Sequence, residues 1–222
     1  MAASASGAPP GKGTIMDMLL DLWLPIVVST VVVFVASTIA WMMLPHHKAD
    51  MRAIEDEGPL DRALEEMKLE AGGYYLPNCS DKEKFKTEAF KKRWNDGPWA
   101  YVVIPPGAPS FGKNMAITLL EFFVISVFIA YLASHALAPG AEYLQVFQIV
   151  GTAGVLAYVL GTIHHQYFQM RTTRHVLACA FDGLVYALLT AGVFAAFWPE
   201  GADLATDAAN IVNDAADALP TP

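Results

Sequence analysis

Two acidic residues lie inside long apolar stretches of this 222-residue chain, where a charged group is costly to bury. Glu121 is six residues into the apolar run 115–137, and Asp182 is six residues into the run 176–198. At 1.5 Å per helical residue, both carboxyls would lie about 9 Å beyond the same boundary, so we expect them to share a layer. A carboxyl group at such a depth usually faces the interior of a helix bundle and marks a functional site.

A hydroxyl group lies about one helical turn from each carboxyl and could support it by hydrogen bonding. Thr118 is placed to support Glu121, and Tyr186 is placed to support Asp182. The two carboxyls could form a pathway for protons or cations, or they could be protonated groups that stabilise the bundle. Taken alone, the pair favours the structural role.

Five of the six histidines fall at the ends of the apolar runs, on the side where the carboxyls are expected. Imidazoles close to carboxylates are the ingredients of a transition-metal site, a proton relay or a bis-histidine haem site. One observation argues against a bound metal or haem: no histidine is paired with a glutamate at the three-residue spacing of a helical ligand set. Adjacent histidines also point to different sides of a helix, so at most one of each pair should face inward. The five residues are His46, His47, His164, His165 and His175.

Short motifs of several enzyme classes are missing from the chain, including the P-loop, HExxH, CxxCH and GxSxG. We therefore assign no catalytic residue, and an enzyme is disfavoured but left open. The two cysteines, Cys79 and Cys179, form neither a disulfide framework nor a paired metal-ligand spacing, and Cys179 is expected to pack as a small apolar residue. No nucleic-acid recognition motif is present either, which argues against a nucleic-acid partner.

The elements that must position these residues are four apolar runs, each long enough to cross roughly 30 Å of hydrocarbon. We predict an all-α membrane protein with four transmembrane helices and a small α+β insert between the first two. The lipid bilayer is then its first partner. The predicted division is a disordered outer leader at 1–15, the first helix at 16–44, the insert at 45–114, the other helices at 115–137, 144–163 and 176–198, and an acidic amphipathic tail at 199–222.

Lysine and arginine residues orient the predicted bundle, because positive residues near helix ends stay on the cytoplasmic side. Of the 14, eleven lie in 45–114, two in 164–175 and one in the leader. This alternation places the insert and the histidine-bearing helix ends in the cytoplasm and both termini outside. We expect the membrane to be the cell (inner) membrane. The net charge of −8 is a sum over two faces and says little about partners.

The insert should contain a helix over 60–67, a second helix opened by a capping box at Ser80 and Glu83, and a strand over 99–104 paired with 74–76. In the last two apolar runs, small residues recur every four positions, which predicts that these helices pack closely. These residues are Ala153, Ala157 and Gly161 in the third run and Gly183, Ala187, Ala191 and Ala195 in the fourth.

This layout favours an accessory or assembly subunit that acts through contacts with other membrane proteins or with further copies of itself. The small-residue seam, the tail with one apolar side and the missing catalytic motifs support that interpretation. The first alternative is a metal- or haem-binding redox membrane protein that uses the cytoplasmic histidines. The second is a proton or cation pathway through Glu121 and Asp182.

Overall fold

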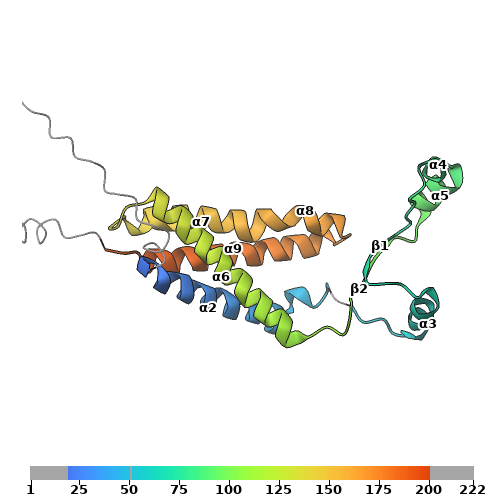
Figure 1. The fold of residues 1–222 in the computed structure, drawn as a ribbon, viewed down its shortest axis with the longest axis horizontal. Coiled ribbons are helices and arrows are strands. Elements are labelled where there is room, and N and C mark those ends of the chain that lie inside the picture. Colours follow the sequence, from blue (N-terminus) through green and yellow to red (C-terminus); the bar gives the residue numbers. More distant parts are fainter. Residues whose placement is uncertain (1–19, 51, 201–222) are drawn as a thin grey trace, which may run out of the picture.

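The computed structural model describes residues 20–50 and 52–200, and it is mostly helical (Figure 1). Within these residues, four helices are long and apolar enough to cross a membrane, which confirms the predicted helix count. The predicted leader at 1–15 and the tail from 201 onward lie outside the described residues. The four spans are Trp23–Met42, α6 (Phe111–Ala136), Tyr143–Phe168 and α9 (Thr173–Ala196).

The first and third spans each contain a π-helical segment, which is wound more loosely than an α-helix and is frequent at functional sites. In the first span, α2 (Trp23–Thr38) passes into a π-helix at Ile39–Met43. In the third, α7 (Tyr143–Val155) is followed by a π-helix at Leu156–Leu160 and by α8 (Gly161–Phe168). The second and fourth spans are continuous α-helices.

The third and fourth spans pack closely, as the small residues predict. A Cβ atom added to Gly154 of α7 would lie 2.9 Å from the Cβ of Ala187 on α9. Gly154 lies outside the predicted four-residue repeat, yet it sets this approach of the two backbones. One turn before Ala187 on α9, a Cβ on Gly183 would lie 2.6 Å from the carbonyl oxygen of Tyr158. Both glycines are therefore required by the packing.

The first and second spans complete the bundle. The hydroxyl oxygens of Ser29 on α2 and Ser126 on α6, both fully buried, lie 3.1 Å apart. On the opposite side of α2, Val27, Val31 and Val35 are exposed every four residues, which is the pattern of a lipid-facing surface. Figure 1 shows α6 running obliquely across the bundle, from the side of α2 toward α7.

The insert lies beyond one end of the bundle in Figure 1, and we call this end the insert end. The predicted antiparallel strand pair is confirmed, with Tyr74 opposite Val102. The predicted capping box is not formed, because the side chain of Asp81 accepts the backbone hydrogen bond of Glu83 at 2.9 Å. The second predicted helix is divided in two. The elements are α3 (Gly58–Met67), β1 (Gly72–Leu76), α4 (Lys82–Phe85), α5 (Glu88–Asp96) and β2 (Ala100–Ile104).

Candidate metal centre at the insert end

One face of α9 carries three potential metal ligands near the insert end. His175, Cys179 and Asp182 follow one another at spacings of four and three residues, so they lie on the same side of the helix. Asp182 lies deepest along the span and is only 5% exposed. A carboxylate buried to this extent requires hydrogen-bond donors or a cation beside it.

Asp182 is paired with both histidines that follow the first span. Nε2 of His46 lies 3.0 Å from Oδ1, and Nε2 of His47 lies 2.7 Å from Oδ2. The expectation that at most one of two adjacent histidines would face inward is therefore wrong for this pair. The backbone is extended at Leu44 and then turns through a 3-10 helix at Pro45–His47, so the angular separation of neighbours on an α-helix does not apply.

Three contacts fix the imidazole ring of His47, which is 4% exposed. The indole of Trp41 stacks on its face, with ring centroids 3.9 Å apart and planes within 6° of parallel. Nδ1 of His47 lies 3.0 Å from Oδ2 of Asp50, while Nε2 of His47 faces Asp182. Trp41 belongs to the π-helical segment, which thus supplies the stacking partner. Both ring nitrogens of His47 contact carboxylates.

Asp50 is held in turn by α9. Nη1 of Arg174 lies 2.5 Å from Oδ1 of Asp50, and Nη2 donates to the backbone carbonyl of His46 at 2.8 Å. Nδ1 of His175 lies 3.2 Å from Oδ2 of Asp50, within ion-pair range but without hydrogen-bond geometry. Burial opposes ionisation of Asp50, but the hydrogen bond to His47 and the nearby His175 and Arg174 outweigh it and lower the pKa of Asp50 from its usual 3.8.

The ionised Asp50 determines which nitrogen of His47 carries a hydrogen. Nδ1 donates to Asp50, so in a neutral imidazole Nε2 presents its lone pair to Asp182 at 2.7 Å. Two acceptors at this distance repel unless a cation lies with them. Either a proton shared between His47 and Asp182 or a metal ion would remove this repulsion. If the histidines are neutral, the formal charges of Asp50, Asp182 and Arg174 sum to −1. This negative charge favours the addition of a proton or the binding of a metal ion.

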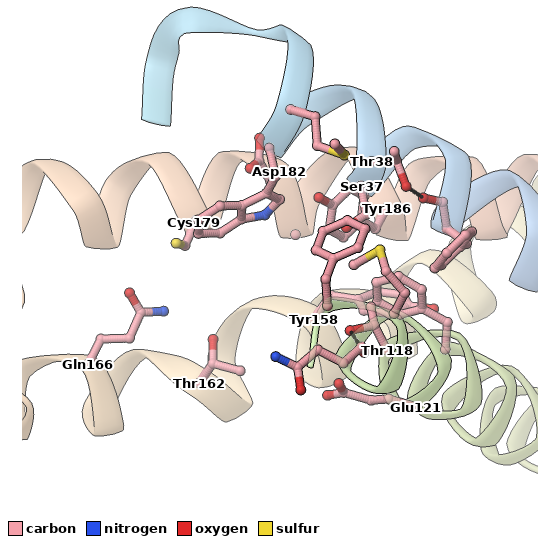
Figure 2. A pocket seen from close by; sticks show the side chains of 18 residues that line it. Ser37, Thr38, Thr118, Glu121, Tyr158, Thr162, Gln166, Cys179, Asp182 and Tyr186 are labelled. Carbon is pink, nitrogen blue, oxygen red and sulfur yellow. Dashed lines mark hydrogen bonds between the residues drawn. The ribbon is translucent and has the colours of Figure 1, made fainter. Parts of the chain in front are cut away.

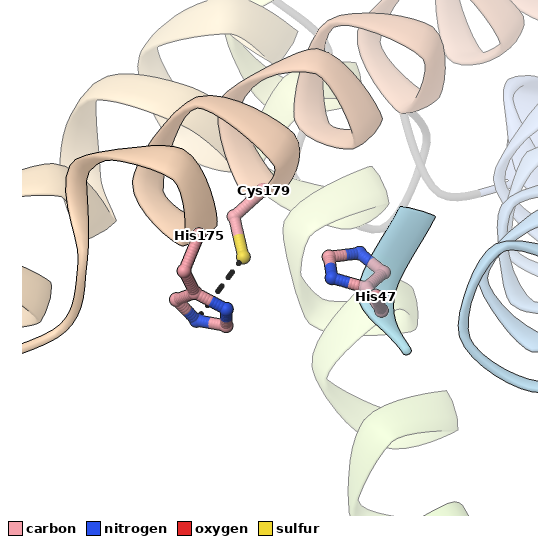
Figure 3. Close-up of side chains that lie close together, drawn as sticks. All are labelled: His47, His175 and Cys179. Carbon is pink, nitrogen blue, oxygen red and sulfur yellow. Dashed lines mark hydrogen bonds between the residues drawn. The ribbon is translucent and has the colours of Figure 1, made fainter. Parts of the chain in front are cut away.

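Two overlapping groups of side chains bring potential ligand atoms within 4.8 Å of one another. The first consists of His46, His47 and Asp182, and the second of His47, His175 and Cys179 (Figure 3). In the second group, Sγ of Cys179 lies 3.5 Å from Nε2 of His175. His47 belongs to both. The first group offers two imidazoles and a carboxylate, whereas the second offers two imidazoles and a soft thiolate.

The two carboxyls predicted to share a layer line one cavity of about 630 Å³ between the four spans. Figure 2 shows Asp182 and Glu121 on opposite sides of it. Thr118 and Tyr186 line the same cavity. However, the hydroxyl of Thr118 donates to the carbonyl of Asn114 at 3.0 Å, and the hydroxyl of Tyr186 has no hydrogen-bond partner among the described residues. Neither hydroxyl supports its neighbouring carboxyl in the way the sequence suggested.

The other two histidines of the predicted cluster lie apart from it. His164 and His165 are exposed on α8 with their rings stacked 4.8 Å apart, and neither joins a ligand group within the described part of the chain. Three residues that contact this cluster were not predicted from the sequence. The spacing of His47 and Asp50, three residues apart, could have revealed one of them. The missed residues are Trp41, Asp50 and Arg174.

Comparison with known proteins identifies no relative of this chain. No family model, no curated protein and no solved structure matches the chain. Function is therefore inferred from the geometry of the site.

Proposed function

We propose that this chain is a multi-pass membrane protein that binds one divalent transition-metal ion at the insert end of its bundle. The ligands are Nε2 of His46, Nε2 of His47 and a carboxylate oxygen of Asp182. The observation that carries the proposal is the convergence of two imidazole nitrogens on one buried carboxylate, at 3.0 and 2.7 Å. Two histidines and one carboxylate form the ligand set of many mononuclear iron sites, and imidazole also suits zinc, copper and nickel.

The surroundings of the three ligands support a metal site. Ligating histidines usually donate their second ring nitrogen to a carboxylate, which fixes the ring and raises its basicity. Asp50 is positioned for this role at Nδ1 of His47, and the ion pair with Arg174 fixes Asp50. The stacked indole of Trp41 restricts rotation of the same ring. His47 is thus oriented on three sides.

The proposed site has open positions. Three protein ligands leave room in the coordination sphere for water or substrate, whereas structural zinc sites are closed by four. Asp182 also lines the cavity of about 630 Å³, which gives a small molecule a route to the ion. These two features favour a catalytic or redox role over a purely structural one.

A haem group fits this geometry less well than a single ion. A haem iron that used His47 would bind it at Nε2 or Nδ1, where the carboxylates of Asp182 and Asp50 already lie at 2.7 and 3.0 Å. The accessory-subunit function stays a prediction, because the tail proposed for docking falls mostly outside the described residues. The proton or cation pathway also stays a prediction.

The test is a metal titration of chelator-treated protein in mild detergent. Co²⁺ binding is followed by optical absorption, and Fe²⁺, Mn²⁺ and Zn²⁺ binding by elemental analysis. We expect one equivalent per chain, and affinity at least about tenfold lower after loss of any one ligand. Unchanged affinity in the Asp182 variant would contradict the proposal. The ligand variants are His46→Ala, His47→Ala and Asp182→Asn, and the matched controls are His164→Ala and His165→Ala.

A further inference from the structure

The cavity beside the proposed metal site has walls from all four spans and a volume of about 630 Å³. This volume is in the range of sites that hold drug-sized molecules. Figure 2 shows side chains from several helices converging on it. Most of its walls are apolar, and rings make up a large share of them. The aromatic lining residues are Phe34, Trp41, Phe111, Phe122, Tyr158 and Tyr186.

The charges around the cavity have one sign. Among its lining residues there is no lysine, arginine or histidine, while Glu121 and Asp182 are both present. Asp182 is already in contact with His46 and His47, so we assign the free counter-charge to Glu121. Glu121 has no hydrogen bond and no ion pair with any residue in the described ranges 20–50 and 52–200. Its side chain is exposed in the four-helix bundle, so inside a membrane the carboxylate would face the cavity or lipid and would need a cation or a donor beside it.

Three aromatic side chains on the cavity wall could contact a bound cation. Phe122, Tyr158 and Tyr186 meet edge to face, with centroids 5.9 to 6.0 Å apart, and form one wall. The face of an aromatic ring attracts a cation within about 6 Å of its centroid. The hydroxyls of Tyr158 and Tyr186 are buried and have no hydrogen-bond partner among the described residues, so each can still accept a hydrogen bond.

We propose that this cavity binds a lipophilic organic cation, with Glu121 as the counter-charge and the aromatic wall as the apolar contact. A neutral lipid chain would fill the apolar walls but leave the carboxylate unpaired. An inorganic cation would pair with the carboxylate but leave most of the apolar volume unfilled. An organic cation satisfies both requirements. The proposal does not depend on a metal at His46, His47 and Asp182.

The experiment compares two probes of nearly the same shape and opposite charge. Binding of tetraphenylphosphonium and of tetraphenylborate to chelator-treated protein in mild detergent is measured by equilibrium dialysis against protein-free detergent. We expect saturable binding of about one tetraphenylphosphonium per chain and no saturable binding of tetraphenylborate. Equal binding of the two ions would overturn the proposal, because the site would then recognise only apolar shape.

Two variants locate the site. Glu121→Gln keeps the size of the side chain but removes its charge, and we expect it to weaken tetraphenylphosphonium binding by at least about tenfold. Phe122→Leu removes one ring of the wall and should weaken binding several-fold. The matched control is Glu142→Gln, an exposed glutamate before α7 and outside the cavity lining, which should bind as the wild type does. Unchanged binding in a folded Glu121→Gln variant, judged by gel filtration, would also overturn the proposal.

Discussion

Nε2 of His47 lies 2.7 Å from Oδ2 of Asp182, although 135 residues separate the two along the chain. The contact joins the turn after the first span to the insert-end half of the fourth, and both side chains are less than a tenth exposed. Two further contacts, from Trp41 and Asp50, orient the same histidine. The arrangement makes His47 the residue through which the turn, the π-helical segment and α9 are coupled.

Removing the carboxylate of Asp50, which contacts Nδ1 of His47, should weaken metal binding although the three proposed ligands remain. In Asp50→Asn the carboxylate that accepts from Nδ1 is lost, so the ring is less well oriented and less basic. We expect the affinity for Co²⁺ to fall about 10- to 100-fold in the same titration. Asp56→Asn is the control, because the side chain of Asp56 contacts only the nearby backbone nitrogen of Gly58 among the described hydrogen bonds. Equal affinities in the two variants would contradict the role given to Asp50.

The lowered pKa of Asp50 predicts a loss of stability in acid. A carboxyl whose pKa is lower in the folded chain than in the unfolded chain stabilises the fold at pH values above its unfolded pKa, here 3.8. That contribution disappears as the pH falls through the folded value. The thermal unfolding midpoint of chelator-treated wild type should therefore exceed that of Asp50→Asn near neutral pH, and the difference should shrink below about pH 4. A difference that stays constant into acid would contradict this assignment.

Much of the fold follows from apolar length and residue spacing, whereas only part of the site does: the sequence places the histidines and Asp182 at one end of the bundle but does not predict their contacts. Four spans, the strand pair and the close approach of α7 and α9 are local or repetitive features, so the sequence expresses them directly. The joint use of His46 and His47 depends on a π-helical segment and a 3-10 turn, which apolar periodicity does not predict. The pairing with Asp182 is a contact between distant segments. Among the three residues that were not predicted, only Asp50 had a local signal in the sequence, which is its three-residue spacing from His47.

A methyl group at Gly183 should destabilise the protein. The Cβ of Gly183→Ala would lie 2.6 Å from the carbonyl oxygen of Tyr158, closer than real Cβ contacts, so the backbones must separate. Overpacking of this kind costs about 1–3 kcal/mol. The matched control is Gly151→Ala in the same helix pair, whose Cβ would lie 3.5 Å from that of Ala191 in ordinary contact. Thermal unfolding in detergent should separate the two variants, and equal midpoints would contradict the predicted clash.

The orientation predicted from lysine and arginine can be tested with the native cysteine of the insert. Cys79 lies between β1 and α4, outside the four spans, and Cys179 can be removed by Cys179→Ser. In vesicles whose cytoplasmic face is turned outward, a membrane-impermeant maleimide should label Cys79 without detergent. In vesicles of the opposite orientation, labelling should require detergent. The reverse result would place the insert outside the cell.

Cys179 decides between the two overlapping ligand groups. It lies within reach of His47 and His175, but the proposed ion is held by His46, His47 and Asp182. In that arrangement Cys179→Ser should leave the Co²⁺ stoichiometry at one and change its affinity by less than about tenfold, because no direct ligand is lost. The wild-type Co²⁺ spectrum should also lack an intense thiolate-to-metal band in the near ultraviolet. If that band is present and disappears in Cys179→Ser, the ion binds in the second group, and His175→Ala should then weaken binding more than His46→Ala.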